Sequence, residues 1–289
     1  MMRHPRVLLS LLPLLIPFAA IFLGGIIITV LQSLGILMFS YHYDDIFFGY
    51  RELLADRWFV ESALFSLYVA ATATTIAIIF GTLFAYLIWR LPHRYHGRTV
   101  IYKVPLILPH IAVGFMAVIL LAKTGVLAAL SYQLGLIDSF TQFPDLLYRA
   151  SGIDIIGAYV YKETPFVMVL VYAMLSRFES RLMDCAKMLG ASPTRIFFTL
   201  ILPFLMPAIN TSFIILFIFS FGGFDLPFVL GDSYPGMISI RIYDYFFHKD
   251  LALRPVAMAM LTLIFLMSLG FIIAYLKIAG KMMPAARKL

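Results

Sequence analysis

The sequence predicts an all-α membrane protein with six transmembrane helices. Of its 289 residues, 62% are hydrophobic and only 13% are charged, whereas about a quarter of the residues of soluble domains are charged. Its apolar runs have about the 20 residues that a helix needs to cross the hydrocarbon core of a bilayer. The single cysteine, Cys185, excludes an internal disulfide and a paired-cysteine metal site.

Each expected span is an apolar run that includes the Gly, Pro, Ser and Thr residues that membrane helices tolerate. The first run is much longer than the roughly 7–15 apolar residues of a signal peptide, so we interpret it as an uncleaved membrane anchor. In chain order, the expected spans cover about residues 7–34, 60–89, 100–121, 153–175, 208–230 and 256–278.

The placement of basic residues predicts the orientation. If the amino terminus is inside, the inner segments hold most of the 22 Lys and Arg residues, while only two of the 15 acids, Glu179 and Asp184, lie there. This positive-inside pattern places both termini, and the segment between spans four and five, in the cytoplasm. It also explains the net charge of +7 without a nucleic-acid partner.

The other long connections are expected outside. Residues 40–58 fit an interfacial or extracytoplasmic segment, and residues 123–140 fit a short re-entrant or surface helix. Residues 231–255 fit a loop followed by a short amphipathic helix near the membrane surface. The expected division is an N-terminal helix with its outer segment, a transmembrane core and a cytoplasmic tail: 1–57, 58–281 and 282–289.

The inner segment DCAKMLGASPTRIFFTLILP, residues 184–203, carries the capping residues of two short helices. Gly190 fits the position that ends the first helix, and Ser192 followed by Pro193 fits the start of the second. The first helix begins either at a capping box formed by Ser176 and Glu179 or as a continuation of span four. On these residues alone, the segment fits an amphipathic loop on the inner membrane face equally well.

Helical spacing predicts which faces of the two helices are covered. The second helix ends near Pro203 and Pro207, which are expected to interrupt the passage into span five. Cys185 is interpreted as a small packing residue in a reducing compartment. The expected apolar faces consist of Phe178, Leu182, Ala186 and Leu189 in the first helix, and Ile196, Phe197, Leu200 and Ile201 in the second.

The same segment resembles the EAA motif of binding-protein-dependent ABC importer permeases. That motif reads Glu-Ala-Ala, three residues, Gly, and ends in Ile-x-Leu-Pro. Asp184, Cys185 and Leu200 replace the Glu, the first Ala and the Ile of the pattern, and the spacing from Gly190 to Pro203 is retained. The resemblance extends over about residues 58–281.

The resemblance implies the transmembrane fold of a type I ABC importer, in which the first short helix is a coupling helix that docks into a cytoplasmic ATPase subunit. The implied partners are a second permease, identical or homologous, two ATPase subunits and an extracytoplasmic substrate-binding protein in a bacterial inner membrane. ATP and Mg are then bound by the ATPases, since this chain contains no GxxxxGK[ST] and needs no cofactor or enzymatic activity of its own. The implied coupling residues are Asp184, Ala186, Gly190, Ala191, Leu202 and Pro203.

Arg181, Lys187 and Arg195 either pair with acids of the ATPase or are ordinary positive-inside charges.

Polar residues within the spans are candidates for a translocation path, because charges at membrane depth need partners or water. Lys162 and Glu163 lie in span four, and glycines loosen span five beside Asp225. The alternative is that Lys162 and Glu163 are interfacial or structural charges and that Asp225 caps a broken helix. By resemblance to related permeases, the path candidates are Tyr161, Glu163, Phe221 and Asp225. His93 and His96 are read as part of a solvated loop rather than a metal site.

The substrate class follows from the segment GGFDLPFVLG, residues 222–231, which resembles permeases of the spermidine/putrescine type. Acids and aromatic rings suit an organic cation such as a polyamine. The same branch resembles uptake systems for iron, thiamine and phosphonates, which stay open as alternatives. Two further alternatives are an autonomous secondary transporter, with Lys162, Glu163 and Asp225 as ion-coupling groups, and a membrane enzyme or scaffold.

Overall fold

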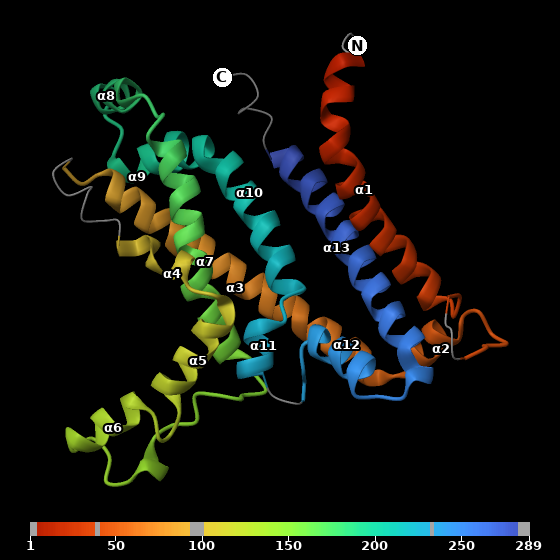
Figure 1. The fold of residues 1–289 in the computed structure, drawn as a ribbon. Helices are drawn as coiled ribbons and strands as arrows, with labels where there is room; N and C mark the ends of the chain where they lie inside the picture. Colours follow the sequence, from red (N-terminus) through yellow and green to blue (C-terminus); the bar gives the residue numbers. More distant parts are fainter. Residues whose placement is uncertain (1–4, 38–40, 93–100, 232–233, 283–289) are drawn as a thin grey trace. The chain divides into compact units, whose positions relative to one another are not determined.

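The computed structural model describes residues 5–37, 41–92, 101–231 and 234–282, and throughout these segments the regular structure is helical (Figure 1). Six helical stretches are long and apolar enough to cross a membrane, which confirms the predicted number of spans. They cover Leu11–Ser33, Arg57–Trp89, His110–Gln133, Ile153–Leu175, Pro193–Phe221 and Leu251–Ala279. His93 and His96 lie outside the described residues.

The chain divides into two compact units, one made of residues 1–61 and 238–270 and the other of residues 62–237 and 271–289. This grouping rests on contacts within the chain, and the division expected from the sequence stays a prediction. The first unit holds α1 (Pro5–Ser33), α2 (Phe48–Ala55), the start of α3 (Arg57–Trp89), α12 (Ile238–Phe247) and most of α13 (Arg254–Met282).

Close packing and polar contacts hold the first unit together. Gly49 of α2 packs directly on the chain at Pro255, since a Cβ at Gly49 would lie 2.6 Å from the Pro255 carbonyl oxygen. The Ser33 hydroxyl at the end of α1 lies 2.8 Å from that of Tyr50. On α12, Arg241 binds Asp56 at 2.6 Å, and both side chains are largely buried. The helix predicted within residues 231–255 is thus confirmed as α12.

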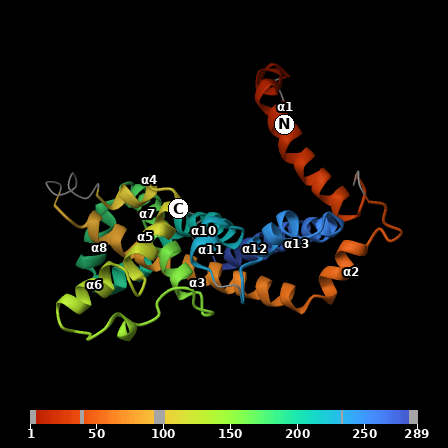
Figure 2. The same ribbon diagram turned by 60° about the horizontal axis from the view of Figure 1, so that its bottom comes forward.

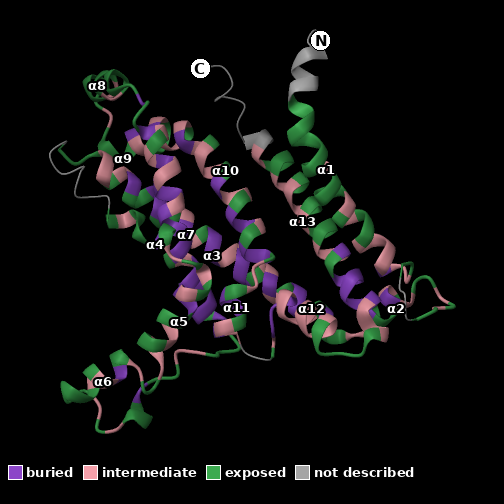
Figure 3. Ribbon diagram, viewed as in Figure 1, coloured by how far each residue is buried: buried purple, intermediate pink, exposed green. Residues whose placement is uncertain are grey.

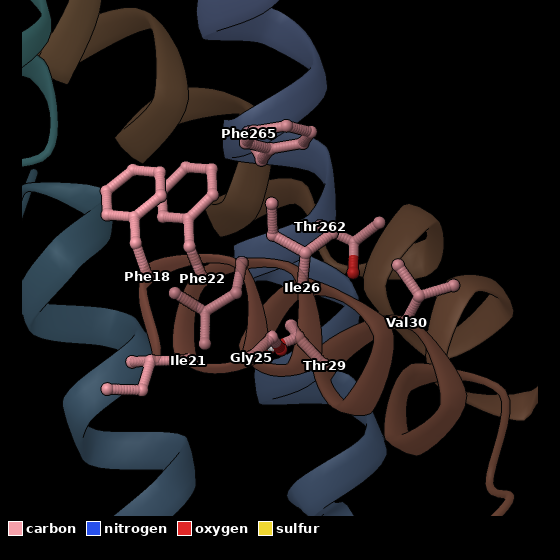
Figure 4. Close-up of a pocket in the computed structure, with 10 residues that line it drawn as sticks. Phe18, Ile21, Phe22, Gly25, Ile26, Thr29, Val30, Thr262 and Phe265 are labelled. Carbon is pink, nitrogen blue, oxygen red and sulfur yellow. Dashed lines mark hydrogen bonds between the residues drawn. The ribbon is translucent and has the colours of Figure 1, made fainter. Parts of the chain in front are cut away.

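An apolar groove of about 520 Å³ runs between α1 and α13 in this unit (Figure 4). Phe18 and Phe22 of α1 stack at a centroid distance of 5.7 Å on one side of it, and Thr262 and Phe265 of α13 lie on the other. In the most apolar part of the α1 span, every residue is at least partly exposed. Such a surface is stable in contact with lipid, which is as apolar as these side chains.

The second unit is built around α7 (Ile153–Leu175), whose bounds agree with the predicted span four. It contacts α4 (Val104–Ile107), α5 (His110–Leu121), α10 (Leu202–Phe221) and α11 (Asp225–Leu230), and these helices surround it in Figures 1 and 2. Buried residues concentrate on α7 and on the helix faces toward it (Figure 3). Gly81 lets α3 approach α7 closely, because a Cβ there would lie 2.5 Å from the Val167 Cβ.

Two of the expected spans are discontinuous. The expected span three, residues 100–121, contains α4 and α5, separated at Leu108 and Pro109, because the residue before a proline is driven to an extended conformation. The apolar stretch of the structure instead begins at His110 and continues through Gln133, so the expected bounds are wrong. The expected span five, residues 208–230, contains most of α10 and α11, separated by residues 222–224, where two glycines disfavour a helix. The apolar stretch of the structure instead covers Pro193–Phe221, so the expected bounds are wrong and α11 lies beyond it. The short helix expected within residues 123–140 is present as α6 (Val126–Gln133).

Candidate coupling helix and translocation path

The predicted helix–Gly–helix is present. The first helix, α8, covers Ser180–Met188, and Gly190 follows it with φ +78°, a conformation that favours glycine. The amides of Gly190 and Ala191 donate to the carbonyls of Lys187 and Ala186 at 2.9 and 3.0 Å, the two bonds of a Schellman motif. These bonds confirm the prediction that Gly190 ends the first helix.

The start of the second helix is also confirmed. The helix α9 covers Pro193–Ile196, and the Ser192 hydroxyl accepts a hydrogen bond from the Arg195 amide at 3.3 Å. This contact satisfies one of the free amides at the helix start, as an N-cap does. The turn between α8 and α9 is therefore determined by local contacts at both ends.

The capping box expected at the start of α8 is absent. α7 ends at Leu175, and the Ser176 hydroxyl donates to the Ala173 carbonyl at 2.8 Å instead of capping a new helix. Glu179 is the N-cap residue of α8, but its side chain makes no cap hydrogen bond. The backbone turns between the two helices, so neither proposed start of α8 was right.

The expected apolar face of the first helix is confirmed for Phe178 and Ala186 but wrong for Leu182 and Leu189. Leu182 is 50% exposed and Leu189 is 88% exposed, while Met183 and Ala186 pack on the buried cluster around Phe178. The covered face is the one that meets the cluster around Phe178, which the periodicity of the helix alone does not specify. Cys185 is exposed, so its interpretation as a packing residue is also wrong.

The chain stays helical from α9 into α10, where an interruption was expected. A π-helical turn, Phe197–Ile201, joins α9 to α10. Pro203 follows Leu202 just after this π-helical turn, and α10 also accommodates Pro207. Ile196 and Ile201 are buried in the adjoining cluster and hold this junction to the rest of the unit.

The six predicted coupling residues form two groups, one on α8 and the turn that follows it and the other at the start of α10. Asp184 and Gly190 are exposed on the α8 turn, and the Asp184 carboxylate pairs with Lys187 at 3.1 Å. Ala186 and Ala191 are partly buried against the cluster beneath. Leu202 and Pro203 lie apart from them at the start of α10. The structure thus joins the two groups through one helical run, without bringing their side chains together.

In span four, Lys162 has a structural partner that the sequence does not reveal. Its side chain is 6% exposed, and its ammonium donates to the carbonyls of Pro105, Leu106 and Leu108, with nitrogen–oxygen distances of 2.5 Å to Pro105 and 3.2 Å to Leu106. These carbonyls belong to the C-terminal end of α4, which carries a partial negative charge. Lys162 therefore caps a helix that ends inside the membrane span.

Glu163 points toward α10 instead. The Glu163 side chain is 2% exposed, and its Oε1 accepts a hydrogen bond from the hydroxyl of Ser220. Ser220 directly precedes the path candidate Phe221. The other carboxylate oxygen, Oε2, is buried and has no hydrogen-bond partner. Adjacent residues of a helix point in different directions, so Lys162 and Glu163 each bind one of the two broken spans.

The remaining path candidates lie elsewhere. Tyr161 is 46% exposed and faces a groove beside α5, away from Glu163 and from Phe221, which is itself 2% exposed. Asp225 is exposed in the first turn of α11, where Phe224 is the N-cap residue and no side chain makes a cap bond. The capping role considered for Asp225 is therefore not seen. The structure brings Glu163 to the end of α10, places Tyr161 in a separate groove and leaves Asp225 exposed at the start of α11.

Exposed aromatic rings accompany Asp225. Phe219 and Phe228 are 47% and 53% exposed, and the ring of His110 lies 4.7 Å from that of Phe219. His110 is not among the residues predicted from the sequence, because an uninterrupted span three places no helix start there. Pro109, immediately before it, was the signal for a helix start at this position.

Comparison with known proteins agrees with this architecture. The family described as binding-protein-dependent transport system inner membrane component matches residues 77–278. The spermidine/putrescine transport system permease protein PotC of Escherichia coli (strain K12) is 28% identical over 229 residues, which cover 78% of this chain and 76% of PotC. The ferric transport system permease protein FbpB of Actinobacillus pleuropneumoniae is 26% identical over 232 residues, 79% of this chain but 32% of FbpB. The chain thus spans about a third of that relative.

Solved structures share the fold. A bacterial ABC transporter involved in the import of the acidic polysaccharide alginate matches with a TM-score of 0.77 at 17% identity, over 95% of both chains. A second structure of an alginate transporter, in complex with its pentasaccharide-bound periplasmic protein, gives a TM-score of 0.79 over 96% of this chain and 95% of the other. With its six apolar helices, the chain therefore belongs to the binding-protein-dependent transport system inner membrane components, as a multi-pass permease subunit of an ABC importer in the bacterial inner membrane.

Proposed function

We propose that this permease couples ATP hydrolysis in partner subunits to the import of a small organic cation such as a polyamine. Both termini and α8 lie in the cytoplasm, where two ATPase subunits bind ATP and Mg. A second permease, identical or homologous, completes the path, and an extracytoplasmic binding protein delivers the solute. ATP binding closes the ATPases and opens the permeases outward, and hydrolysis resets them inward.

The exposure of α8 carries the coupling part of this proposal. Met188 and Leu189 at its end are each 88% exposed, which is costly for large apolar side chains next to one another in water. A docking cleft on an ATPase would cover them. The Schellman turn at Gly190 and the helical run into α10 then transmit a displacement of α8 to span five.

A change at the exposed end of α8 tests the coupling. Leu189→Asp should fold normally, because the side chain contacts solvent, yet it should release the ATPase subunits or uncouple hydrolysis from uptake. Gly190→Arg and Asp184→Lys should act in the same direction. Leu134→Asp is the matched control, since Leu134 is 72% exposed in the segment after α6. Wild-type ATPase stimulation and uptake in the α8 variants, measured in proteoliposomes, would exclude the docking role.

The face around Asp225 supports a cationic solute. An exposed acid with exposed aromatic rings close to it in sequence, just beyond the apolar stretch Pro193–Phe221, supports contact with water or a solute rather than lipid. The carboxylate would pair with an ammonium group while Phe219 and Phe228 supply cation–π contacts. Glu163 and Phe221 would support this path from the junction of α7 and α10, and Tyr161 was predicted to line it.

Removing the charge of Asp225 tests the path. We expect Asp225→Asn to lower putrescine uptake by about tenfold, while binding-protein affinity stays unchanged. Asp138→Asn, in the segment after α6, is the control for loss of one carboxylate elsewhere. Unaltered kinetics and substrate range in Asp225→Asn would exclude a role in the path.

A ferric ion is the second candidate solute, favoured by the 26% identity to the ferric permease FbpB. Uptake of radiolabelled putrescine and of radiolabelled iron by the same reconstituted importer separates the two. Iron uptake without putrescine uptake would replace the polyamine proposal.

A further inference from the structure

A second groove, of about 490 Å³, lies between α5 and α7 in the second unit. Met116 and Leu120 form part of its α5 wall, and Gly157 and Tyr161 form part of its α7 wall. Arg149 lies at the end of the groove near the start of α7. The volume is in the range of pockets that bind small molecules.

Gly157 makes the groove hollow. A Cβ at this position would meet no atom within 4 Å. At Gly81, by contrast, a Cβ would lie 2.5 Å from the Val167 Cβ, where α3 packs on α7. The glycine is therefore not needed for helix contact within this chain. It leaves open space at the middle of the α7 wall.

The groove has the length of half a bilayer. From Ile153, where the span begins, to Tyr161 are eight residues, or about 12 Å along a helix. The hydrocarbon core is about 30 Å thick, so the groove runs from the edge of the membrane to near its midplane. One acyl chain of a phospholipid covers the same depth.

Arg149 lies at the outer end of this mostly apolar groove, four residues before α7, and the buried Asp154 also lines the groove. The Arg149 side chain is exposed and makes no ion pair among the described residues. The nearby Asp154 already accepts hydrogen bonds from the amides of Tyr148, at 2.7 Å, and Ile155, at 3.0 Å. The guanidinium is thus available at the level of the headgroups, where it matches a phosphate in charge and geometry.

We propose that this groove binds one anionic phospholipid, with the phosphate on Arg149 and one acyl chain between α5 and α7. The apolar walls and the cation are placed as the two parts of such a lipid require. Tyr161 then contacts the acyl chain near the midplane rather than the solute. This inference rests on the membrane location of the chain and not on the proposed solute or coupling.

Native mass spectrometry of the detergent-purified importer tests the site, with phosphatidylglycerol and phosphatidylethanolamine added in separate titrations. The wild type should retain phosphatidylglycerol in preference to phosphatidylethanolamine. Arg149→Gln should weaken phosphatidylglycerol binding by about fivefold, the effect expected for one cation at the membrane surface. Gly157→Leu and Leu120→Trp fill the groove from opposite walls, and each should remove the bound lipid.

Gly270→Leu on α13 is the matched control, since a Cβ at Gly270 also meets no atom within 4 Å. It should retain phosphatidylglycerol as the wild type does. Wild-type binding in both Gly157→Leu and Leu120→Trp would overturn the proposal, and so would wild-type binding in Arg149→Gln. Separation of the permease pair in Gly157→Leu, with lipid binding intact, would show that a protein helix fills the groove.

Discussion

Replacing Lys162 by methionine tests whether this residue holds the broken span three to α7. Methionine keeps most of the length of the side chain and removes its charge and its three donors. In the wild type these donors reach the carbonyls of Pro105, Leu106 and Leu108. The change therefore leaves the end of α4 without its cap in a mostly buried site.

The magnitude follows from two opposing effects. Each hydrogen bond to a charged group contributes about 1.5–3 kcal/mol, so three lost bonds outweigh the roughly 3 kcal/mol gained by removing a charge from membrane depth. Because one ammonium shares the three bonds, we expect a net loss near the lower limit, about 2–3 kcal/mol. For a chain of this size that lowers the midpoint of thermal unfolding by about 3–5 °C.

Thermal unfolding of the purified assembly in detergent measures this loss. Lys123→Met is the matched control, because Lys123 makes an exposed ion pair with Asp145 and such pairs contribute less than about 1 kcal/mol. Equal midpoints for Lys162→Met and Lys123→Met would refute the capping role.

Three further changes test packing and ionisation. Gly81→Ala should lower the free energy of unfolding by about 1–3 kcal/mol through its clash with Val167, and unchanged chemical denaturation would contradict close α3–α7 contact. Gly223→Ala places a Cβ 2.0 Å from the Tyr159 hydroxyl oxygen; Tyr159→Phe should recover much of the lost thermal stability, and failure to do so would implicate the backbone instead. Burial, followed by a neighbouring carboxylate, raises the pKa of Tyr245 above its ordinary value. The folded state then holds the proton longer than the unfolded state, so stability falls as pH rises through about 10. Tyr245→Phe should flatten this fall in melts at alkaline pH, and an equal slope would contradict the assignment.

Local chemistry was sufficient for the parts of the candidate site that depend on neighbours in sequence. Gly190 and Ser192 end and start their helices as expected, because capping bonds join residues within a few positions. The face of α8 was not predictable in this way. Leu189 is apolar and correctly spaced, yet it is exposed, since the part of α8 that is covered depends on the cluster around Phe178 and on partners outside the chain.

Hydropathy in the sequence determined the number of spans and the exact extent of α7, because a bilayer selects for length and apolar composition whatever the packing. The partners of the two charges in that span were decided by the tertiary structure alone. Lys162 reaches carbonyls 54–57 residues away, and Glu163 reaches Ser220 across 57 residues. Such pairings depend on how the helices are rotated against one another. That rotation results from close contacts such as Gly81 on Val167, which no periodicity within a single helix encodes.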